Sequence, residues 1–269
     1  MKLRDIIGEL YSIYNPKIAE NWDNVGLMLG SENSEINKIL VCLDVTNEAV
    51  EKAVKEKVDL IISHHPFIFS GIKKITDETV LGRKILKLAE NKVSVYSIHT
   101  NSDFAVNGLN DFIMDKLNLE GKTEIFGECE FDDYNCIKDV NEKVKYGTVR
   151  IKTLDKEIEL KELIEKIKTN LGLDYIRYTG ENRKIRKIGL VTGGGSSLLN
   201  DVKEYTDVFL TGDLKYHEAL DNLEEGKIFV DIGHYESEYL FSDLIELQLS
   251  HFFDGEIIKY FGKPVFNLG

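Results

Sequence analysis

The sequence is poor in cysteine. Its three cysteines, Cys42, Cys129 and Cys136, are odd in number and widely spaced, and no CxxC pair occurs. This pattern argues against a disulfide framework and predicts free thiols in a reducing cytoplasm.

Basic residues are also scarce relative to acidic ones. The chain has 34 Lys and Arg against 47 Asp and Glu, which gives a formal net charge of −13. A general electrostatic attraction to nucleic-acid phosphates or anionic lipids is therefore disfavoured, although a local basic patch stays compatible with this charge. We do not expect nucleic acid as a partner.

No apolar run approaches the length that spans a bilayer. The N-terminal stretch "MKLRDIIGELYSIY" carries charges within its apolar pattern and lacks the h-region and small-residue cleavage site of a signal peptide. We expect a soluble cytoplasmic protein with no membrane partner. With 269 residues, 42% of them hydrophobic, the chain can form one large α/β domain or two smaller lobes.

Short β-branched runs alternate with amphipathic stretches such as "TNEAVEKAVKEK" along most of the chain. This order is typical of βαβ units. We predict an α/β fold of two interlinked lobes with mostly parallel sheets, one over 1–125 and one over 126–269, joined through a segment where "YGTVRIKTL" alternates like a half-exposed strand. The predicted buried strands are Ile39–Leu43, Leu60–Ser63, Val93–Ile98, Lys187–Val191, Val208–Leu210 and Ile228–Asp231.

Polar residues follow the predicted strands, at the edge of a parallel sheet where ligands bind. The second strand ends in "SHHP", the third in "SIHTNSD", the fourth in "TGGGSS", the fifth in "TGDLKYHEA" and the sixth in "DIGHYESE". The glycine-rich stretch either holds a phosphate or lets a strand and a helix pack closely. Asp44, Thr46 and Asp213 look like strand-end or cap residues, and His217 and His251 like surface residues of helices.

Five of these side chains form a combination that suits metals. His64, His65, Asp103, His234 and Glu238 supply three imidazoles and two carboxylates from three strand ends. This mixture fits a borderline divalent metal such as Zn²⁺, Mn²⁺, Fe²⁺, Co²⁺ or Ni²⁺. Since five ligands exceed the needs of one catalytic ion, we expect two ions roughly 3.5–4 Å apart.

Helix geometry separates two neighbouring carboxylates in "GHYESE". If one helix begins after Gly233 and continues through Leu247, His234 and Glu238 lie four residues apart on one face. Glu236 then points elsewhere, about 200° from both. We therefore predict Glu238, and not Glu236, as the ligand.

The stretches "NWDNVGL", "SHHP", "HTNSD", "TGGGSS", "LTGDLKYHEA" and "GHYESE" resemble, in order and spacing, those of the NIF-three-like family, whose members are also called GTP cyclohydrolase I type 2 homologs. The resemblance covers nearly the whole chain. It implies a dinuclear metal centre bound by the same five residues, in a two-lobed subunit of a toroidal homohexamer. Longer members carry an inserted domain, for which this chain has no room.

The expected chemistry is metal-dependent hydrolysis. Two metals activate a water and polarise a substrate, and the family name suggests opening of the imidazole ring of GTP, so the expected partner is a small molecule such as a nucleotide. That reaction needs a proton donor, for which His99 is the first candidate and Asp23 the second. The alternative is a non-catalytic metal-binding scaffold or regulatory assembly that engages protein or nucleic acid.

Overall fold

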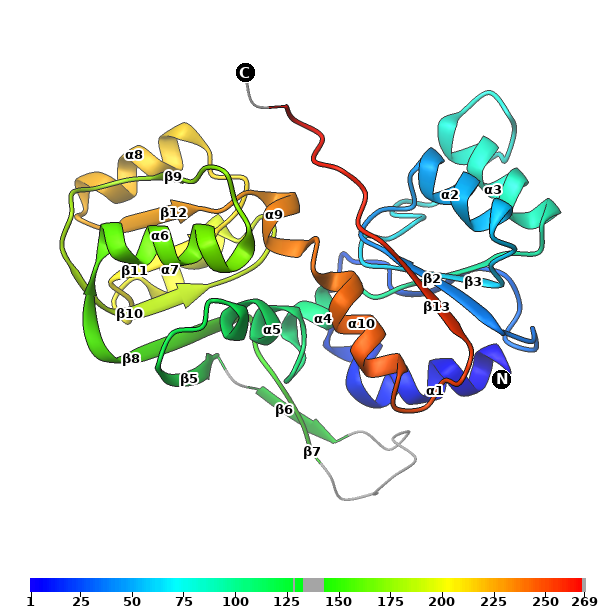
Figure 1. Ribbon diagram of the computed structural model, residues 1–269, viewed down its shortest axis with the longest axis horizontal. Helices are drawn as coiled ribbons and strands as arrows, with labels where there is room; N and C mark the ends of the chain where they lie inside the picture. Colours follow the sequence, from blue (N-terminus) through cyan, green and yellow to red (C-terminus); the bar gives the residue numbers. More distant parts are fainter. Residues whose placement is uncertain (128, 133–142, 268–269) are drawn as a thin grey trace. The chain divides into compact units, whose positions relative to one another are not determined.

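The computed structural model describes residues 1–127, 129–132 and 143–267 (Figure 1). Among the predicted thiols, Cys42 is a free, buried cysteine, whereas Cys136 and the side chain of Cys129 lie outside the described part of the chain. Within the described ranges, no helix has both the length and the apolarity needed to cross a membrane.

The described residues form two compact units. The first unit contains residues 1–102 and 239–267, and the second contains residues 103–127, 129–132 and 143–238. This division differs from the predicted boundary after residue 125, because Asp103 belongs to the second unit and the C-terminal segment to the first. The physical reason is that the last strand, β13 (Glu256–Tyr260), pairs in parallel with β2 (Lys38–Cys42) and completes the first sheet.

The sheet of the first unit has the strand order β1-β4-β3-β2-β13. All neighbouring pairs are parallel except β1 with β4, as predicted for this lobe. The helix α4 (Thr100–Phe104) begins in this unit and ends in the second. The remaining elements of the first unit are α1 (Leu3–Ile13), the 3-10 helix η1 (Pro16–Ile18), β1 (Gly26–Leu29), β2, α2 (Asn47–Lys55), β3 (Leu60–Ser63), α3 (Val80–Glu90), β4 (Ser94–Ser97), α10 (Phe241–Leu249) and β13.

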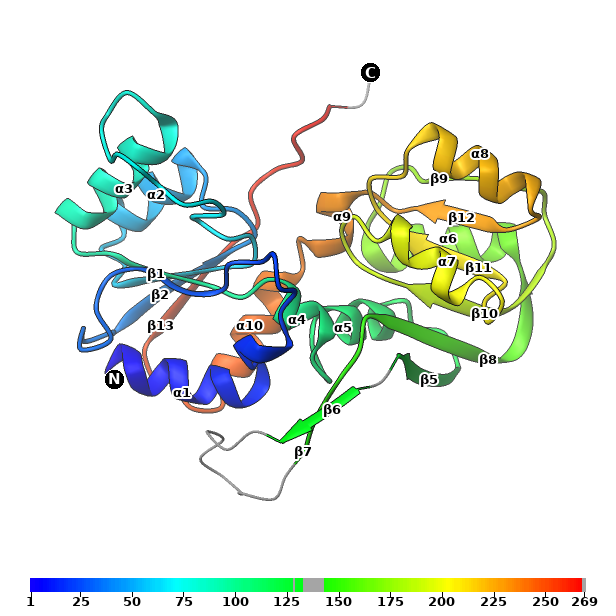
Figure 2. The same cartoon turned by 180° about the vertical axis from the view of Figure 1, so that it is seen from behind.

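Helices cover both faces of the first sheet. Figures 1 and 2 show α2 and α3 on one face and α1 and α10 on the other. Alternating strand residues such as Leu40 and Ile61 pack into one buried cluster with Val50 of α2 and Ile85 of α3. The sheet is thus buried on both sides, which explains its near-continuous apolar strands.

The sheet of the second unit has the order β5-β8-β10-β11-β12-β9. Only the pairs β10 with β11 and β11 with β12 are parallel in this sheet, and the other three are antiparallel, so the expectation of mostly parallel strands holds at its centre and fails elsewhere. The elements of the second unit are α5 (Leu109–Lys116), β5 (Gly121–Phe126), β6 (Cys129–Asp132), β7 (Lys143–Tyr146), β8 (Val149–Glu159), α6 (Leu160–Leu171), β9 (Arg177–Tyr178), β10 (Lys184–Leu190), the 3-10 helix η2 (Ser196–Leu198), α7 (Leu199–Val202), β11 (Val208–Thr211), α8 (Tyr216–Glu224), β12 (Ile228–Asp231) and α9 (His234–Glu238).

Strand β8 corrects the expectation of a half-exposed transition segment. It pairs with β5 on one side and β10 on the other, and its first four residues are buried. The buried guanidinium of Arg150 in this strand donates to the carboxylate of Asp111 at 2.5 Å. The positive charge of Arg150 is thereby paired with a negative charge inside the second unit. The segment therefore forms part of the core of the second sheet, between α6 and α7 on opposite faces (Figures 1 and 2).

The helix predicted to run from Gly233 through Leu247 is two helices. α9 ends at Glu238 and α10 begins at Phe241. The interruption coincides with the passage of the chain from the second unit to the first between Glu238 and Tyr239. The buried apolar residues of the predicted run, among them Phe241, Leu244 and Ile245, therefore belong to the first unit, whereas His234 and Glu238 belong to the second.

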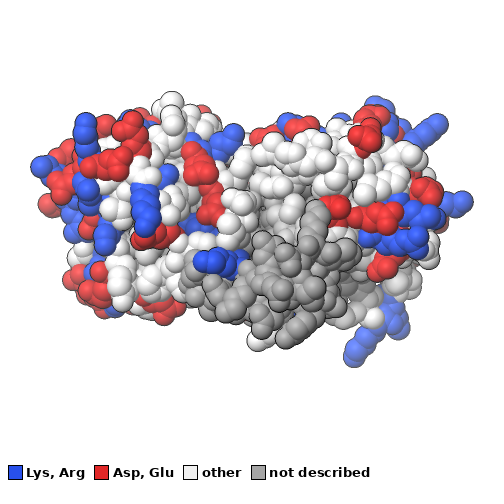
Figure 3. All heavy atoms as spheres, turned by 90° about the horizontal axis from the view of Figure 1, so that it is seen from below, with Lys and Arg blue, Asp and Glu red and all other residues white. Residues whose placement is uncertain are grey.

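The charge of the surface is mixed. On the face shown in Figure 3, acidic and basic side chains are interspersed on both units, without a continuous basic stripe among the residues drawn in colour. The net charge is −13, and the coloured residues of this face form no extended cationic surface for a phosphate backbone.

Candidate functional site

Three histidines gather at the carboxyl end of the first sheet. His64 and His65 follow β3, and His99 follows β4. The hydroxyl of Ser63 donates to the carbonyl of His65 at 2.9 Å and contacts Ser97 across the two strands. This bond bends the chain at the end of β3, so that the two neighbouring imidazoles lie near each other with centroids 5.1 Å apart.

The Nδ1 atoms of His64 and His65 are held by acceptors. His64 is fully buried, and its Nδ1 lies 2.9 Å from the carbonyl oxygen of Ile98. His65 Nδ1 lies 2.8 Å from the carboxylate of Asp44. Because a carbonyl oxygen only accepts, His64 Nδ1 carries the proton, and Nε2 is then the nitrogen that can ligate a metal. The carboxylate of Asp44 orients His65 in the same way.

His99 completes a group with the chemistry of a metal site. Its ring centroid lies 5.2 Å from that of His64 and 5.6 Å from that of His65. One potential ligand nitrogen from each of the three rings lies within 4.8 Å of the others, so this group could hold a metal ion. The structure therefore groups His99 with the two predicted ligands, which were expected to bind metal without it.

Asp23 fixes the ring of His99. Its carboxylate accepts from His99 Nδ1 at 2.9 Å and from the hydroxyl of Thr100 at 2.6 Å. Burial by itself would raise the pKa of Asp23, but the hydrogen bonds from His99 and Thr100 and the charge of His99 outweigh burial and lower this pKa to about 2. Asp23 is thus an ionised partner of His99 at neutral pH, and not a proton donor as its second place among the candidates implied.

In the second unit, His234 and Glu238 face each other along α9. His234 Nε2 lies 3.1 Å from a buried carboxylate oxygen of Glu238, as expected for residues four apart on one helical face. His234 Nδ1 lies 2.7 Å from the carboxylate of Asp213. Glu236 turns back toward Gly233, where an added Cβ would lie 2.2 Å from Glu236 Oε2. The geometry agrees with the predicted separation of the two glutamates.

The third predicted ligand of this unit, Asp103, is also buried. Its backbone carbonyl accepts from the side-chain amide of Asn110 at 2.9 Å, and its carboxylate accepts from the hydroxyl of Thr192 at 3.4 Å. The same Thr192 bonds Asn110. Asp103 is thereby tied to the start of the glycine-rich loop after β10.

The loop "TGGGSS" serves close packing. The backbone N–H of Gly193 donates to Ser237 at 2.9 Å, and that of Gly195 donates to Thr211 at 2.8 Å. Gly193 has a φ of +61°, and a Cβ there would lie 2.2 Å from the carboxylate of Glu238. Since these donors are engaged by the protein, the packing alternative is favoured over phosphate binding.

Sequence reasoning missed the roles of Asp44 and Asp213. Both were assigned as ordinary strand-end or cap residues, yet each holds the Nδ1 of a predicted metal-binding histidine. One signal was present: each aspartate follows a buried strand and precedes its histidine by 21 residues. The cap expectation is confirmed for Thr46, whose hydroxyl accepts from the backbone N–H of Ala49.

Two histidines lie outside these groups, as expected. His217 on α8 is exposed and contacts the ring of Tyr216, and His251 is exposed just after α10. Neither occurs in a potential metal-binding group within the described ranges.

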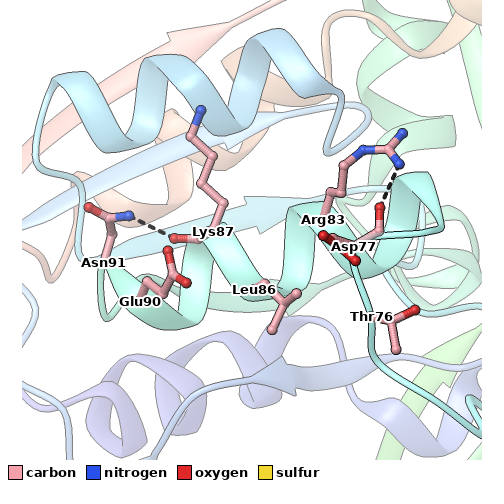
Figure 4. Close-up of a pocket in the computed structure, with 7 residues that line it drawn as sticks. All are labelled: Thr76, Asp77, Arg83, Leu86, Lys87, Glu90 and Asn91. Atoms are coloured by element: carbon pink, nitrogen blue, oxygen red, sulfur yellow. Dashed lines mark hydrogen bonds between the residues drawn. The ribbon is translucent and has the colours of Figure 1, made fainter.

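An open groove along α3 contains no group of side chains like the histidine group or the His234–Glu238 pair (Figure 4). Arg83 donates to the backbone carbonyl of Asp77, and Lys87 pairs with Glu51, so both cations are engaged within the first unit. Its lining mixes both charges and contains none of the predicted ligands: Thr76, Asp77, Arg83, Leu86, Lys87, Glu90 and Asn91.

Comparison with known proteins identifies the family. Residues 1–261 match the sequence profile of Duf34/NIF3 (NGG1p interacting factor 3). A GTP cyclohydrolase 1 type 2 homolog from Clostridium perfringens is 38% identical over 241 residues, covering 89% of this chain and 87% of that protein. A protein of Helicobacter pylori named GTP cyclohydrolase 1 type 2 is 33% identical over 250 residues, covering 93% and 92%.

A solved structure has the same fold. The crystal structure of the Staphylococcus aureus hypothetical protein SA1388 aligns with a TM-score of 0.88 and 29% identity, over 100% of this chain and 99% of that one. The resemblance stated from the sequence motifs is thus confirmed by the profile match and by the relatives. This chain belongs to the Duf34/NIF3 family.

Proposed function

We propose that the protein is a hydrolase that binds two divalent metals through His64, His65, Asp103, His234 and Glu238. The observation that carries this proposal is the orientation of the three imidazoles: each Nδ1 is held by a carbonyl or carboxylate oxygen, which directs Nε2 to ligation. The donor set of imidazoles and carboxylates fits Zn, Fe, Mn, Co or Ni.

Both proposed carboxylate ligands lie next to points where the chain passes from one unit to the other. Asp103 follows Ser102, the last residue of the first unit in that stretch, and Glu238 precedes Tyr239, where the chain re-enters the first unit. Each carboxylate is therefore tethered by one peptide bond to the unit that carries His64 and His65. Five ligands for one centre favour a pair of ions.

Bound metals would supply Lewis acidity and a water activated near neutral pH. The chain itself supplies proton transfer through His99, whose Nδ1 is fixed by the ionised Asp23, which leaves Nε2 for the transfer. In ring opening, the water oxygen would bond to the ring carbon while His99 Nε2 takes the proton that the water loses; His99 would then give this proton to the leaving nitrogen as the C–N bond breaks, and so return to its starting state. The names of relatives point to GTP as a substrate to test first.

Elemental analysis and a substrate screen test the proposal. After reconstitution with each candidate metal, we expect close to two metals per chain; one or none removes the dinuclear assignment. The loaded protein is then screened against nucleotides, cyclic amides and phosphoesters for His99-dependent turnover. Two bound metals without turnover of any compound would overturn the hydrolase assignment and favour the metal-binding scaffold.

A further inference from the structure

An exposed aromatic pair lies beside the histidine group of the first unit. Trp22, the only tryptophan in the chain, is 58% exposed, and Phe69 is 54% exposed. Their ring centroids lie 6.1 Å apart, with the planes tilted by 50°. A large aromatic surface kept in water is unfavourable unless something covers it.

The two loops that carry these rings are tied together. The side-chain amide of Asn24 donates to the backbone carbonyl of Ile68 at 2.5 Å, which joins the residue two positions after Trp22 to the residue before Phe69. Asp23, the neighbour of Trp22, accepts bonds from His99 and Thr100. The backbone that follows Trp22 is therefore anchored at Asp23 and Asn24, which limits the positions open to the indole ring before a ligand binds.

Trp22 also adjoins the proposed proton carrier. Its ring lies 6.0 Å from the imidazole of His99, centroid to centroid, with an interplanar angle of 74°. A planar ligand stacked on the indole face would have its edge near His99. Aromatic faces bind flat heterocycles by stacking and discriminate little among their polar substituents.

We propose that Trp22 and Phe69 form a stacking subsite for a planar heteroaromatic ring of the substrate, next to His99. This inference rests on the proposed hydrolase function and narrows its substrate class to compounds with such a ring. The subsite holds the ring while His99 protonates a ring nitrogen, so it contributes to binding more than to the chemical step.

Fluorescence tests the subsite directly, because all tryptophan emission of this protein comes from Trp22. The metal-loaded protein is titrated with GMP and, in parallel, with ribose 5-phosphate, which has the same sugar phosphate without the ring. We expect saturable quenching by GMP and none by ribose 5-phosphate. Equal responses to the two probes, or no response to GMP, would overturn the proposal.

Substitutions test the stacking subsite independently of the proposed hydrolase function. Trp22→Leu should weaken binding of the ring compound at least about 10-fold, with metal content unchanged, and Trp22→Phe should restore most of it. Tyr216→Leu, which removes another exposed aromatic ring, is the matched control and should change nothing. If turnover occurs and Trp22→Leu leaves KM unchanged, the subsite is wrong while the hydrolase function stands.

A second copy of the chain is the competing occupant of these rings. Light scattering of Trp22→Leu distinguishes it: the stacking subsite predicts the same mass as the wild type. A smaller assembly, together with wild-type GMP binding, would assign the aromatic pair to a subunit interface and overturn the proposal.

Discussion

Asp23 concentrates four hydrogen bonds on one carboxylate. It accepts from the backbone N–H groups of Asn24 and Thr100, from the hydroxyl of Thr100, and from His99 Nδ1. This arrangement fixes both the position and the tautomer of His99, which is the role of the carboxylate beside a catalytic histidine. At the scale of single residues, the proposed chemistry therefore depends on this pair.

We expect His99→Ala to retain metal and to lose about 100- to 10,000-fold in kcat, because it removes the proton carrier while the five proposed ligands remain. Metal content by elemental analysis and steady-state kinetics measure the two effects. His251→Ala, which removes an exposed histidine, serves as the control. Since the three rings of the histidine group are close enough to share an ion, loss of metal in His99→Ala would make His99 a ligand instead.

The lowered pKa of Asp23 predicts a pH-dependent contribution to stability. The folded-state pKa of about 2 lies below the usual 3.8, so this contribution is fully present above about pH 5 and is lost as the pH falls through 3.8 toward 2. Urea unfolding measures the free energy of unfolding of the metal-free wild type and of Asp23→Asn. The wild type should exceed the variant most near pH 6, and the difference between the two free energies should shrink toward pH 2.5. A difference that grows in acid would contradict the assignment.

At the scale of elements, α9 places its ligands by helical spacing. His234 and Glu238 meet on one face, and the helix ends directly after Glu238. The loop after β10 packs against this face through Gly193, whose lack of a side chain makes room for the carboxylate of Glu238. The position of Glu238 thus depends on two elements far apart in the sequence.

Glu238→Ala should empty at least one metal position and abolish activity, because no neighbouring carboxylate replaces it on that face of α9. Glu236→Ala should keep both metals, since Glu236 folds back toward Gly233. Metal content of the two purified variants gives the answer. Equal losses, or a greater loss for Glu236→Ala, would show that the ligand on α9 is misassigned.

Gly193→Ala should lower both metal content and stability. Its Cβ would lie 2.2 Å from Glu238 Oε1, and a φ of +61° is strained for alanine by about 1–2 kcal/mol. Thermal unfolding and elemental analysis test this expectation. Gly194→Ala is the matched control, because the nearest atoms to its Cβ would be 3.9 Å away. Equal stability and equal metal content of the two variants would show that the close packing of the loop against Glu238 contributes to neither property.

At the scale of the whole molecule, the chain passes between its two units near proposed ligands. One passage follows Ser102 and the other follows Glu238, and β13 then completes the first sheet. The described part of the first unit consists of two stretches, residues 1–102 and 239–267, which are far apart in the sequence. We infer that the units fold interdependently, since the first sheet lacks its edge strand until the C-terminal residues are present.

The family resemblance predicts a homohexamer, so light scattering should give about six times the 30.7 kDa mass of the chain. A closed ring would restrict access to the proposed metal centre and favour small-molecule substrates. Metal binding can shift an assembly equilibrium toward the form that binds metal more tightly, so the mass is measured with and without bound metal. The mass of a 30.7 kDa monomer under both conditions would contradict this prediction.

Much of the fold could be predicted from local patterns. The strands Leu60–Ser63 and Ile228–Asp231 have the predicted bounds, and four further predicted strands match observed ones within a few residues. The strands β1 and β13 were missed, although each contains a short apolar stretch. Both lie at the edges of the first sheet and are only partly buried, so composition carries little signal for them.

Local patterns were enough to predict which residue types stand at the strand ends, because the end of each buried run can be located from the order of strands and helices. They were also enough to place His234 and Glu238 on one helical face, since that relation depends on local geometry alone. Long-range packing established the remaining relations: Asp44, Asp23 and Asp213 hold the imidazoles, Asp103 belongs to the second unit, and β13 returns to the first. These relations join residues 21 or more positions apart, and such contacts depend on how strands pair and loops pack, which no local pattern specifies.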